Sequence, residues 1–301
     1  MEFDTPDYDV MIVGAGRVGQ TLGRLLVEAG VRVTRVACRS RAAAEQAVAF
    51  IGAGEPHTCE SLARQPASAH PEVLLLTTPD AAIASTALRL APGRATWHGV
   101  TVLHCSGALS STVLQGLGQH GAALGSMHPL HAFGSALAAP ASLRGVHWCI
   151  EGDATAKQLA RQMIALFQGV VSDIEAHQKI LYHAAAAVAG NLLTGLFSLA
   201  VSMLEHCGIA REQGRAMLLP LSEGVLQRLR SAGELAALAG PIDRGDAATV
   251  AQHVLKLREL PPVYLEVYRS LSRELVELAR QKGTPAALLA DIEHLLRDPG
   301  S

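Results

Sequence analysis

The sequence lacks any run of lysine or arginine, since its 25 basic and 27 acidic side chains are nearly balanced at a formal net charge of −2. Nucleic acid is held mainly by clustered basic side chains, so it is not expected as a partner. Cysteine is scarce too: the five cysteines are scattered, without C-x-x-C spacing, and an odd number cannot all form disulfides. The N-terminus lacks the basic and apolar stretches of a signal peptide. These absences together favour a cytoplasmic protein.

The chain of 301 residues is long enough for two domains, and its 49% hydrophobic content is ample for at least one substantial core. The first half alternates short apolar runs with helical stretches. The predicted strands cover residues 10–13, 31–37, 73–78, 101–104, 122–125, 146–150 and 170–174, and the predicted helices cover 19–29, 40–51 and 81–90. This alternation predicts an α/β fold over residues 1–174, a doubly wound Rossmann domain with a parallel sheet.

Apolar residues recur at helical spacing through the second half, where turn residues become rare. The predicted helices cover residues 176–206, 211–231, 247–260, 263–281 and 285–297. Glycine and proline residues separate them. An all-α C-terminal domain is therefore predicted over residues 175–301, and we expect it to bind substrate and to form a homodimer.

Residues 184–204 contain no charged side chain and are long enough to cross a bilayer. Two features favour a buried helix of a soluble protein instead. Much of the segment is alanine, glycine, serine and threonine, with Asn191 near its middle, and its flanks lack aromatic belts and clustered basic residues. We therefore expect no membrane partner, and membrane attachment is the alternative.

A glycine-rich loop, Gly14-Ala15-Gly16-Arg17-Val18-Gly19, follows the first predicted strand and opens the first predicted helix. In this context Gly14 permits a tight turn, Gly16 lets the backbone approach a pyrophosphate, and Gly19 allows close packing of helix on strand. The unpaired N–H groups at the start of a helix attract an anion. The loop, including Arg17 and Val18, is therefore predicted to bind the pyrophosphate of a dinucleotide.

The end of the second predicted strand indicates which dinucleotide is bound. NAD-binding proteins usually place an acid there for the ribose hydroxyls, but here the strand is followed by Arg39 and Ser40. A guanidinium and a hydroxyl suit the 2′-phosphate of NADP. The sequence thus predicts NADP(H) as the cofactor, with Arg39 as a plain surface residue the alternative. Thr78 and Pro79 follow the third predicted strand and are expected beside the cofactor, while Asp80 could cap the next helix.

Two further loops follow short apolar runs, so both should reach the carboxyl edge of the sheet. One contains His104 and Ser106, and the other contains His128 and His131. Imidazole is the side chain best able to exchange a proton near neutral pH, although each histidine could equally bond a loop carbonyl. A metal site is not expected, because Pro129 interrupts a helical ligand spacing and neither loop carries an acid.

Polar residues also lie in the helical half. His183 and Asn191 are about two turns apart on the long apolar helix, so they should face roughly the same side. Buried polar groups need partners, which a substrate or a neighbouring helix could provide. Arg244 could pair with a substrate carboxylate, or with the acids of its own loop, Asp243 and Asp246.

The most informative segments are CRS, TTPD, HCSGAL, HPLHAF, YHAAAAVAGN and GPIDRGDAATVAQH, together with the glycine loop. Through them the chain resembles, over nearly its whole length, the Rossmann-like proteins that carry a C-terminal domain of unknown function 2520. This group is similar to a wider class that contains ketopantoate reductase, pyrroline-5-carboxylate reductase, prephenate dehydrogenase and 6-phosphogluconate dehydrogenase. The resemblance implies a helical domain like that of 6-phosphogluconate dehydrogenase, and nicotinamide-dependent reduction of a C=O or C=N bond.

The wider class also implies roles for particular residues. Prephenate and arogenate dehydrogenases have a catalytic histidine in a similar H-P loop and a serine after the preceding strand, which match His128 and Ser106. Hydroxyacid dehydrogenases place a lysine four residues before a helical asparagine. Asn191 matches the asparagine, but the lysine position holds Ala187, so His183 or His128 would have to supply the proton.

These observations together predict an enzyme, an NADP(H)-dependent oxidoreductase. We expect NADPH to reduce a small keto or imino acid, with a ketopantoate-like molecule as a candidate, between the two domains. His128 would be the general acid, and Ser106 and Asn191 would orient the substrate. His131 or Arg244 would bind its carboxylate. The alternative is an NADP(H)-binding sensor or partner-binding module without turnover, which the missing lysine favours and the histidine-rich loops oppose.

Overall fold

The computed structural model describes residues 8–63, 72–93, 96–133 and 140–297. The chain divides into an N-terminal unit, residues 1–191, and a C-terminal unit, residues 192–301. The sequence places the domain boundary earlier, after residue 174. The N-terminal unit extends further because the first turns of the long helix contact the sheet through Lys179 and Tyr182.

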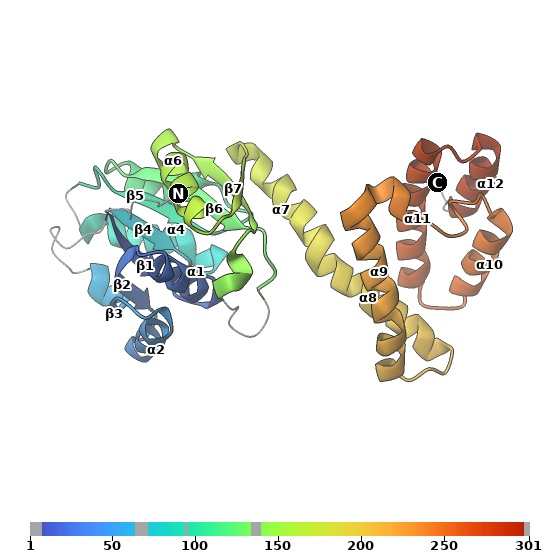
Figure 1. The fold of residues 1–301 in the computed structure, drawn as a ribbon, viewed down its shortest axis with the longest axis horizontal. Helices are drawn as coiled ribbons and strands as arrows, with labels where there is room; N and C mark the ends of the chain where they lie inside the picture. Colours follow the sequence, from blue (N-terminus) through green and yellow to red (C-terminus); the bar gives the residue numbers. More distant parts are fainter. Residues whose placement is uncertain (1–7, 64–71, 94–95, 134–139, 298–301) are drawn as a thin grey trace. The chain divides into compact units, whose positions relative to one another are not determined.

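Within the described residues, eight strands form one sheet of the N-terminal unit (Figure 1). In chain order they are β1 Asp9–Val13, β2 Arg32–Cys38, β3 Glu55–Thr58, β4 Val73–Leu76, β5 Thr101–His104, β6 Ala123–Pro129, β7 His147–Gly152 and β8 Val170–Asp173. Their order across the sheet is β3-β2-β1-β4-β5-β6-β7-β8. The sequence predicts seven of these strands; β3 has the sequence EPHT, which lacks the apolar run that predicts a strand.

The sheet is mostly parallel, as the sequence predicts, but β6 and β7 pair in antiparallel fashion. A parallel pair needs a crossover connection, usually a helix. The described part of the connection between β6 and β7 contains only a short 3-10 turn, Pro140–Leu143. The other pairs in the sheet are parallel.

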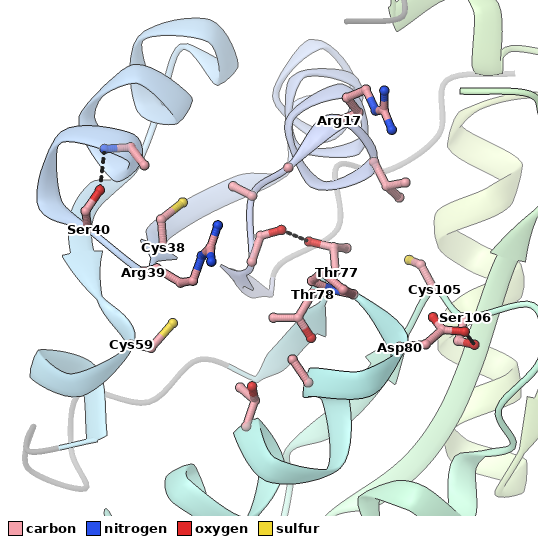
Figure 2. A pocket seen from close by; sticks show the side chains of 18 of the residues that line it. Arg17, Cys38, Arg39, Ser40, Cys59, Thr77, Thr78, Asp80, Cys105 and Ser106 are labelled. Carbon is pink, nitrogen blue, oxygen red and sulfur yellow. Dashed lines mark hydrogen bonds between the residues drawn. The ribbon is translucent and has the colours of Figure 1, made fainter. Parts of the chain in front are cut away.

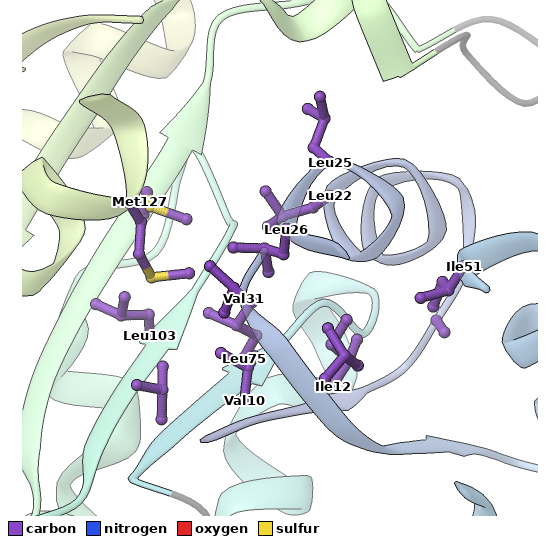
Figure 3. Packing of buried hydrophobic residues seen from close by; sticks show 14 of the residues in the cluster. Val10, Ile12, Leu22, Leu25, Leu26, Val31, Ile51, Leu75, Leu103 and Met127 are labelled. Carbon is purple, nitrogen blue, oxygen red and sulfur yellow. The ribbon is translucent and has the colours of Figure 1, made fainter. Parts of the chain in front are cut away.

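Helices cover both faces of the sheet, which confirms the doubly wound architecture. One face packs against α1 Arg17–Glu28, α2 Arg41–Ile51 and α6 Ala154–Leu166, and the other packs against α3 Cys59–Ala63, α4 Asp80–Leu90 and α5 Gln115–Gly118. Because side chains alternate along a strand, Val10 and Ile12 of β1 join the first layer while Met11 and Val13 join the second. Figure 3 shows the first layer between β1 and α1.

The last residues of β6 pair with only one neighbouring strand, β7. Its parallel pairing with β5 ends at the pair His104 and Ser126. Its antiparallel pairing with β7 continues through His128 to Pro129. His128 therefore lies on a part of β6 that only β7 holds in the sheet.

The long apolar helix consists of α7 Lys179–Ala187, a π-helical turn at Val188–Leu192 and α8 Leu193–His206. The prediction that this segment is buried is wrong for the single chain. Only 6% of its most apolar window is buried, and by length and composition it is the one helix among the described residues that could cross a membrane. A helix of this kind is by itself weak evidence for a membrane span, and an apolar surface of this length is equally suited to a protein partner.

The C-terminal unit is helical, as the sequence predicts. Besides α8 it contains α9 Arg211–Ala237, α10 Ala247–Leu257, α11 Pro262–Lys282 and α12 Ala286–Leu296. Its core is formed by apolar residues of α10, α11 and α12, among them Val250, Val276 and Ile292. The fold is thus a Rossmann domain followed by an all-α domain.

Candidate dinucleotide and active site

The glycine loop joins β1 to α1 in a conformation that requires two of its glycines. Gly14 has a φ of +91°, and a Cβ atom there would lie 2.6 Å from the backbone nitrogen of Thr78. A Cβ atom on Gly19 would lie 2.3 Å from Oγ1 of Thr77. At Gly16 the nearest atom to such a Cβ is 3.9 Å away, so this position faces open space that a ligand can enter. This is the arrangement that lets the backbone approach a pyrophosphate.

A cavity of about 1250 Å³ lies along this loop at the carboxyl ends of the parallel strands (Figure 2). The loop, the end of β2, the turn after β4 and the turn after β5 form its wall. The predicted cofactor residues in this wall are Gly14, Gly16, Arg17, Val18, Arg39, Ser40, Thr78 and Pro79. Gly19 supports the wall by packing on Thr77.

Polar atoms in this wall fit a dinucleotide. Oγ1 of Thr78 is buried and has no hydrogen-bond partner among the described residues, so a ligand could satisfy it. Oγ of Ser40 accepts from the backbone N–H of Ala43 at the start of α2, which leaves its hydroxyl hydrogen to donate. Arg39 is exposed beside it in the wall. Arg89 of α4 also lines the cavity, and the sequence did not single it out because its helix carries no motif.

Ser106 is the centre of a tight turn after β5. Its hydroxyl donates to Oδ2 of Asp80 at 2.7 Å and accepts from the backbone N–H groups of Ala108 and Leu109. Its own N–H donates to Nδ1 of His104. The hydroxyl is therefore already engaged, and its partner Asp80, from the TTPD segment, also lines the cavity.

His128 meets α7 beside this turn. Its Nδ1 atom is 2.8 Å from the hydroxyl of Tyr182, and its ring centroid is 6.4 Å from that of His183. A Cβ atom on Gly107 would lie 2.9 Å from Nε2 of His128 and 2.8 Å from Nδ1 of His183. Gly107 thus has no room for a side chain, and its backbone brings the Ser106 turn against both rings.

His128 and His104 both have pKa values well below the ordinary value for histidine. Burial lowers the pKa of His128 to about 4, and the charge of Lys179 adds to this effect. Burial and the same lysine lower the pKa of His104 to about 4 as well. Both rings are therefore neutral at pH 7, so His128 can donate or accept a hydrogen bond there but is rarely an imidazolium.

Sequence reasoning missed Lys179, which is 1% exposed and hydrogen-bonds in the middle of this cluster. The spacing of polar residues along the helix could have identified it. Lys179, Tyr182 and His183 are three and four residues apart, which places them on one face of α7. A lysine on that face, at the start of an apolar helix, indicates a buried partner.

Three more predicted site residues differ in their surroundings. His131 stacks edge-on with Phe133, at 5.0 Å between ring centroids. Asn191 is exposed on the π-helical turn, so the expectation that it is buried is wrong in the single chain. His183 is exposed too, although it lies beside His128.

Arg244 belongs to the C-terminal unit and is exposed. The acids of its loop have other partners: Asp243 pairs with Lys282 at 2.9 Å, and Asp246 caps α10 by accepting from Thr249. Its predicted role in binding a carboxylate stays a prediction. Among the described residues, no group of three or more His, Cys, Asp or Glu side chains could hold a metal ion.

Two family models match parts of the chain. Residues 2–129 match the model of a Rossmann-like domain, and residues 146–275, which begin within the N-terminal unit, match that of a domain of unknown function, DUF2520. The search of curated proteins found no match.

Solved structures share the fold. Protein TM1727 from Thermotoga maritima is 23% identical with a TM-score of 0.71, covering 90% of this chain and 99% of that one. A candidate NADP oxidoreductase from Bacteroides fragilis is 20% identical with a TM-score of 0.68, covering 91% and 100%. A reductive aminase from Aspergillus terreus, solved with NADPH and ethyl levulinate, is 16% identical with a TM-score of 0.61, covering 96% and 99%. At such identities the likeness shows the fold.

Proposed function

We propose that this protein is an NADP(H)-dependent oxidoreductase that reduces a C=O or C=N bond of a small keto or imino acid. One observation carries the proposal: Ser106 lines the cavity that fits a dinucleotide, and the next residue, Gly107, lies so close to the ring of His128 that it has no room for a side chain. The bound NADPH would supply the hydride. The likeness in fold to the NADP oxidoreductase and the reductive aminase described above supports this choice of cofactor and reaction.

Arg39 and Ser40 are the proposed ligands of the 2′-phosphate, which would make NADP(H) the preferred dinucleotide. The glycine loop would hold the pyrophosphate at the start of α1. Thr78 and Pro79 would contact the dinucleotide from the turn after β4. The reacting bond would lie where Asp80 and Ser106 line the cavity.

The proton needed at the substrate depends on the bond that is reduced. A ketone, such as a ketopantoate-like acid, becomes an alcohol only if a group such as His128 donates a proton. Because the pKa of His128 is lowered to about 4, the imidazolium is scarce at pH 7. An iminium group already carries its proton and needs only a hydride. The neutral ring of His128 therefore suits an imino acid better than a keto acid at neutral pH.

Three other proposals follow from the sequence. Asn191 would orient the substrate, with His131, His183 or Arg244 binding its carboxylate. The exposed apolar helix would be covered by a second copy of the chain, giving a homodimer. The protein would work in the cytoplasm.

The experiment is to mix the purified protein with NADPH and a panel of 2-oxo acids and cyclic imino acids that includes ketopantoate and pyrroline-5-carboxylate. We expect loss of NADPH absorbance with at least one imino acid. In His128→Asn, turnover of any keto acid that the wild type reduces should fall by about 100-fold or more while NADPH binds as before. The matched control is His98→Asn, which changes an exposed histidine of the same unit. Unchanged turnover in His128→Asn would contradict the role of His128.

A sensor that binds NADP(H) without turnover is the second candidate, because the lysine position of the hydroxyacid dehydrogenases holds Ala187 and His128 is a poor acid at pH 7. Tight binding of NADPH with no oxidation across the panel would support this candidate. Oxidation with any panel member would contradict it.

A further inference from the structure

Lys179 makes two hydrogen bonds that join three elements of the N-terminal unit. From the first residue of α7, its Nζ atom donates to the backbone oxygen of Ser106 at 2.7 Å and to Oγ of Ser126 at 2.8 Å. Ser106 follows β5, and Ser126 lies on β6. The side chain is 1% exposed, so this ammonium group takes its partners from the protein rather than from water.

The negative charge that balances this ammonium lies across β6 and β7. Glu151 faces Ser126 in the antiparallel register, is 4% exposed, and accepts from Oγ of Ser126 at 3.4 Å. Both the backbone N–H and the hydroxyl of Ser111 also donate to it. Ser126 accepts from Lys179 and donates to Glu151, so its single hydroxyl joins the two buried charges.

We propose that Lys179 is a positioning residue of the candidate active site: its buried ammonium holds the Ser106 turn against His128 and keeps a fixed positive charge beside that ring. The inference rests on the proposed function, because it gives Lys179 a task in the same reaction. Ser126 and His128 are two residues apart on β6, so their side chains lie on one face of the strand, the face that Lys179 reaches.

Two effects follow from this position. Without the ammonium, the backbone oxygen of Ser106 loses its partner, and the turn that brings Gly107 against His128 becomes free to move. The fixed charge also opposes protonation of His128. Burial already lowers the pKa of the ring, and the fixed charge of Lys179 lowers it further.

Other groups face the ring of His128 and act on it in both directions. From α7, Lys179 and His183 lower its pKa, and from α4 the carboxylate of Asp80 raises it. Tyr182 of α7 hydrogen-bonds to the ring, and Cys149 of β7 lies opposite His128 in the register. The charge of Lys179 also lowers the pKa of His104, whose buried ring lies on β5.

The test measures the protonation of His128 directly, in the full-length protein without added cofactor. Histidine carrying an isotope label is titrated by NMR, and His128→Asn assigns the signal of His128. In the wild type this signal should show a pKa well below the ordinary 6.5. In Lys179→Met the pKa should rise by about one unit. Lys157→Met, on α6, removes an ammonium that makes none of these contacts, and it should leave the pKa unchanged.

Lys179→Gln is the second variant, because its amide can still donate to Ser106 or Ser126 while the charge is lost. It should raise the pKa of His128 as Lys179→Met does, even where the methionine variant does not fold. A wild-type His128 that titrates near 6.5, or a pKa unmoved in a folded Lys179 variant, would overturn the proposal. Because the titration needs no turnover, a protein that oxidises no NADPH would contradict the proposed function and leave this inference standing.

Discussion

The hydroxyl of Tyr182 lies 2.8 Å from Nδ1 of His128, joining α7 to β6. Burial raises the pKa of Tyr182, so the phenol keeps its proton and can donate it to Nδ1. When Nδ1 of the neutral ring accepts, the ring proton lies on Nε2. Nε2 is one of the two ring atoms nearest to Gly107, and we propose that this tautomer offers its N–H to the substrate.

Replacing Tyr182 by phenylalanine should therefore impair chemistry more than binding. Tyr182→Phe leaves Nδ1 without a donor, which frees the ring to change tautomer and to rotate. We expect kcat to fall about tenfold while the Kd of NADPH changes less than about twofold. Tyr264→Phe, in the C-terminal unit, is the control and should leave both unchanged. An equal loss of NADPH affinity would show that Tyr182 serves the fold rather than the ring.

The preference for NADP(H) is tested at Arg39. Arg39→Ala removes the guanidinium beside Ser40, so the Kd of NADPH should rise about tenfold or more while that of NADH changes little. Fluorescence titration measures both constants. The control is Arg41→Ala, because Arg41 lies outside the cavity wall and pairs with Glu45. Equal losses for NADPH and NADH would contradict the proposed contact with the 2′-phosphate.

The glycine loop allows a separation of folding from binding. At Gly16 a Cβ atom meets nothing closer than 3.9 Å and φ is −77°, so Gly16→Ala should keep the Tm within about 2 °C. The new methyl group nevertheless points into the space proposed for the pyrophosphate, and NADPH binding should be lost. Gly14→Ala has a positive φ and collides with Thr78, so it should lower the Tm by several degrees. Full NADPH affinity in Gly16→Ala would place the cofactor elsewhere.

The buried histidines predict a loss of stability in acid. The folded-state pKa of His104 is lowered from 6.5 to about 4, so the unfolded chain binds the proton first as the pH falls. The resulting stability is present above pH 6.5 and is lost as the pH falls from there towards 4. His104 should account for roughly 3 kcal/mol of the decrease in unfolding free energy between pH 7 and pH 4.

Urea unfolding of the wild type and His104→Asn at both pH values measures this contribution. Asparagine keeps an acceptor for the N–H of Ser106 but does not titrate. The variant should therefore lose less stability in acid than the wild type. An identical pH dependence for the two proteins would show that His104 is not held neutral.

The exposed apolar helix is expected to bind a second copy of the chain. Leu192 is 60% exposed and Leu196 is 39% exposed. Exposed leucines on a helix this long form an apolar surface that is unfavourable in water. Leu196→Glu should convert a dimer into a monomer in light scattering after size-exclusion chromatography. Leu88→Glu, on α4 and 62% exposed, should not. Recovery of the wild type only in detergent would instead support a membrane partner.

Much of the fold follows from the sequence because strands and helices of a Rossmann domain carry strong local patterns. The sequence predicts a short buried strand at Thr101–His104, and the structure contains that strand with the same bounds. The antiparallel β7 was not predictable in the same way. Its residues form an apolar run like those of the parallel strands, and strand direction depends on the connection rather than on the strand itself.

The candidate site shows the same limit. The motifs placed His128 and Ser106 near each other, and the structure brings both to Gly107 and Asp80. That the Ser106 hydroxyl is already engaged could not be predicted, because its partners come from α4 and from its own turn. Burial of Lys179 likewise depends on how α7 packs on β6, a contact between segments far apart in the chain.

The pairing of β6 separates two tasks within one sheet. The parallel strands around the glycine loop would bind the cofactor. His128, by contrast, lies on the last part of β6, which pairs only with β7. Local opening of β7 would detach the ring without disturbing the glycine loop, so hydrogen exchange at His128 should be independent of that at β1. The same separation would let the reaction change in evolution while dinucleotide binding is kept, because substitutions in the last part of β6 leave the parallel strands unchanged.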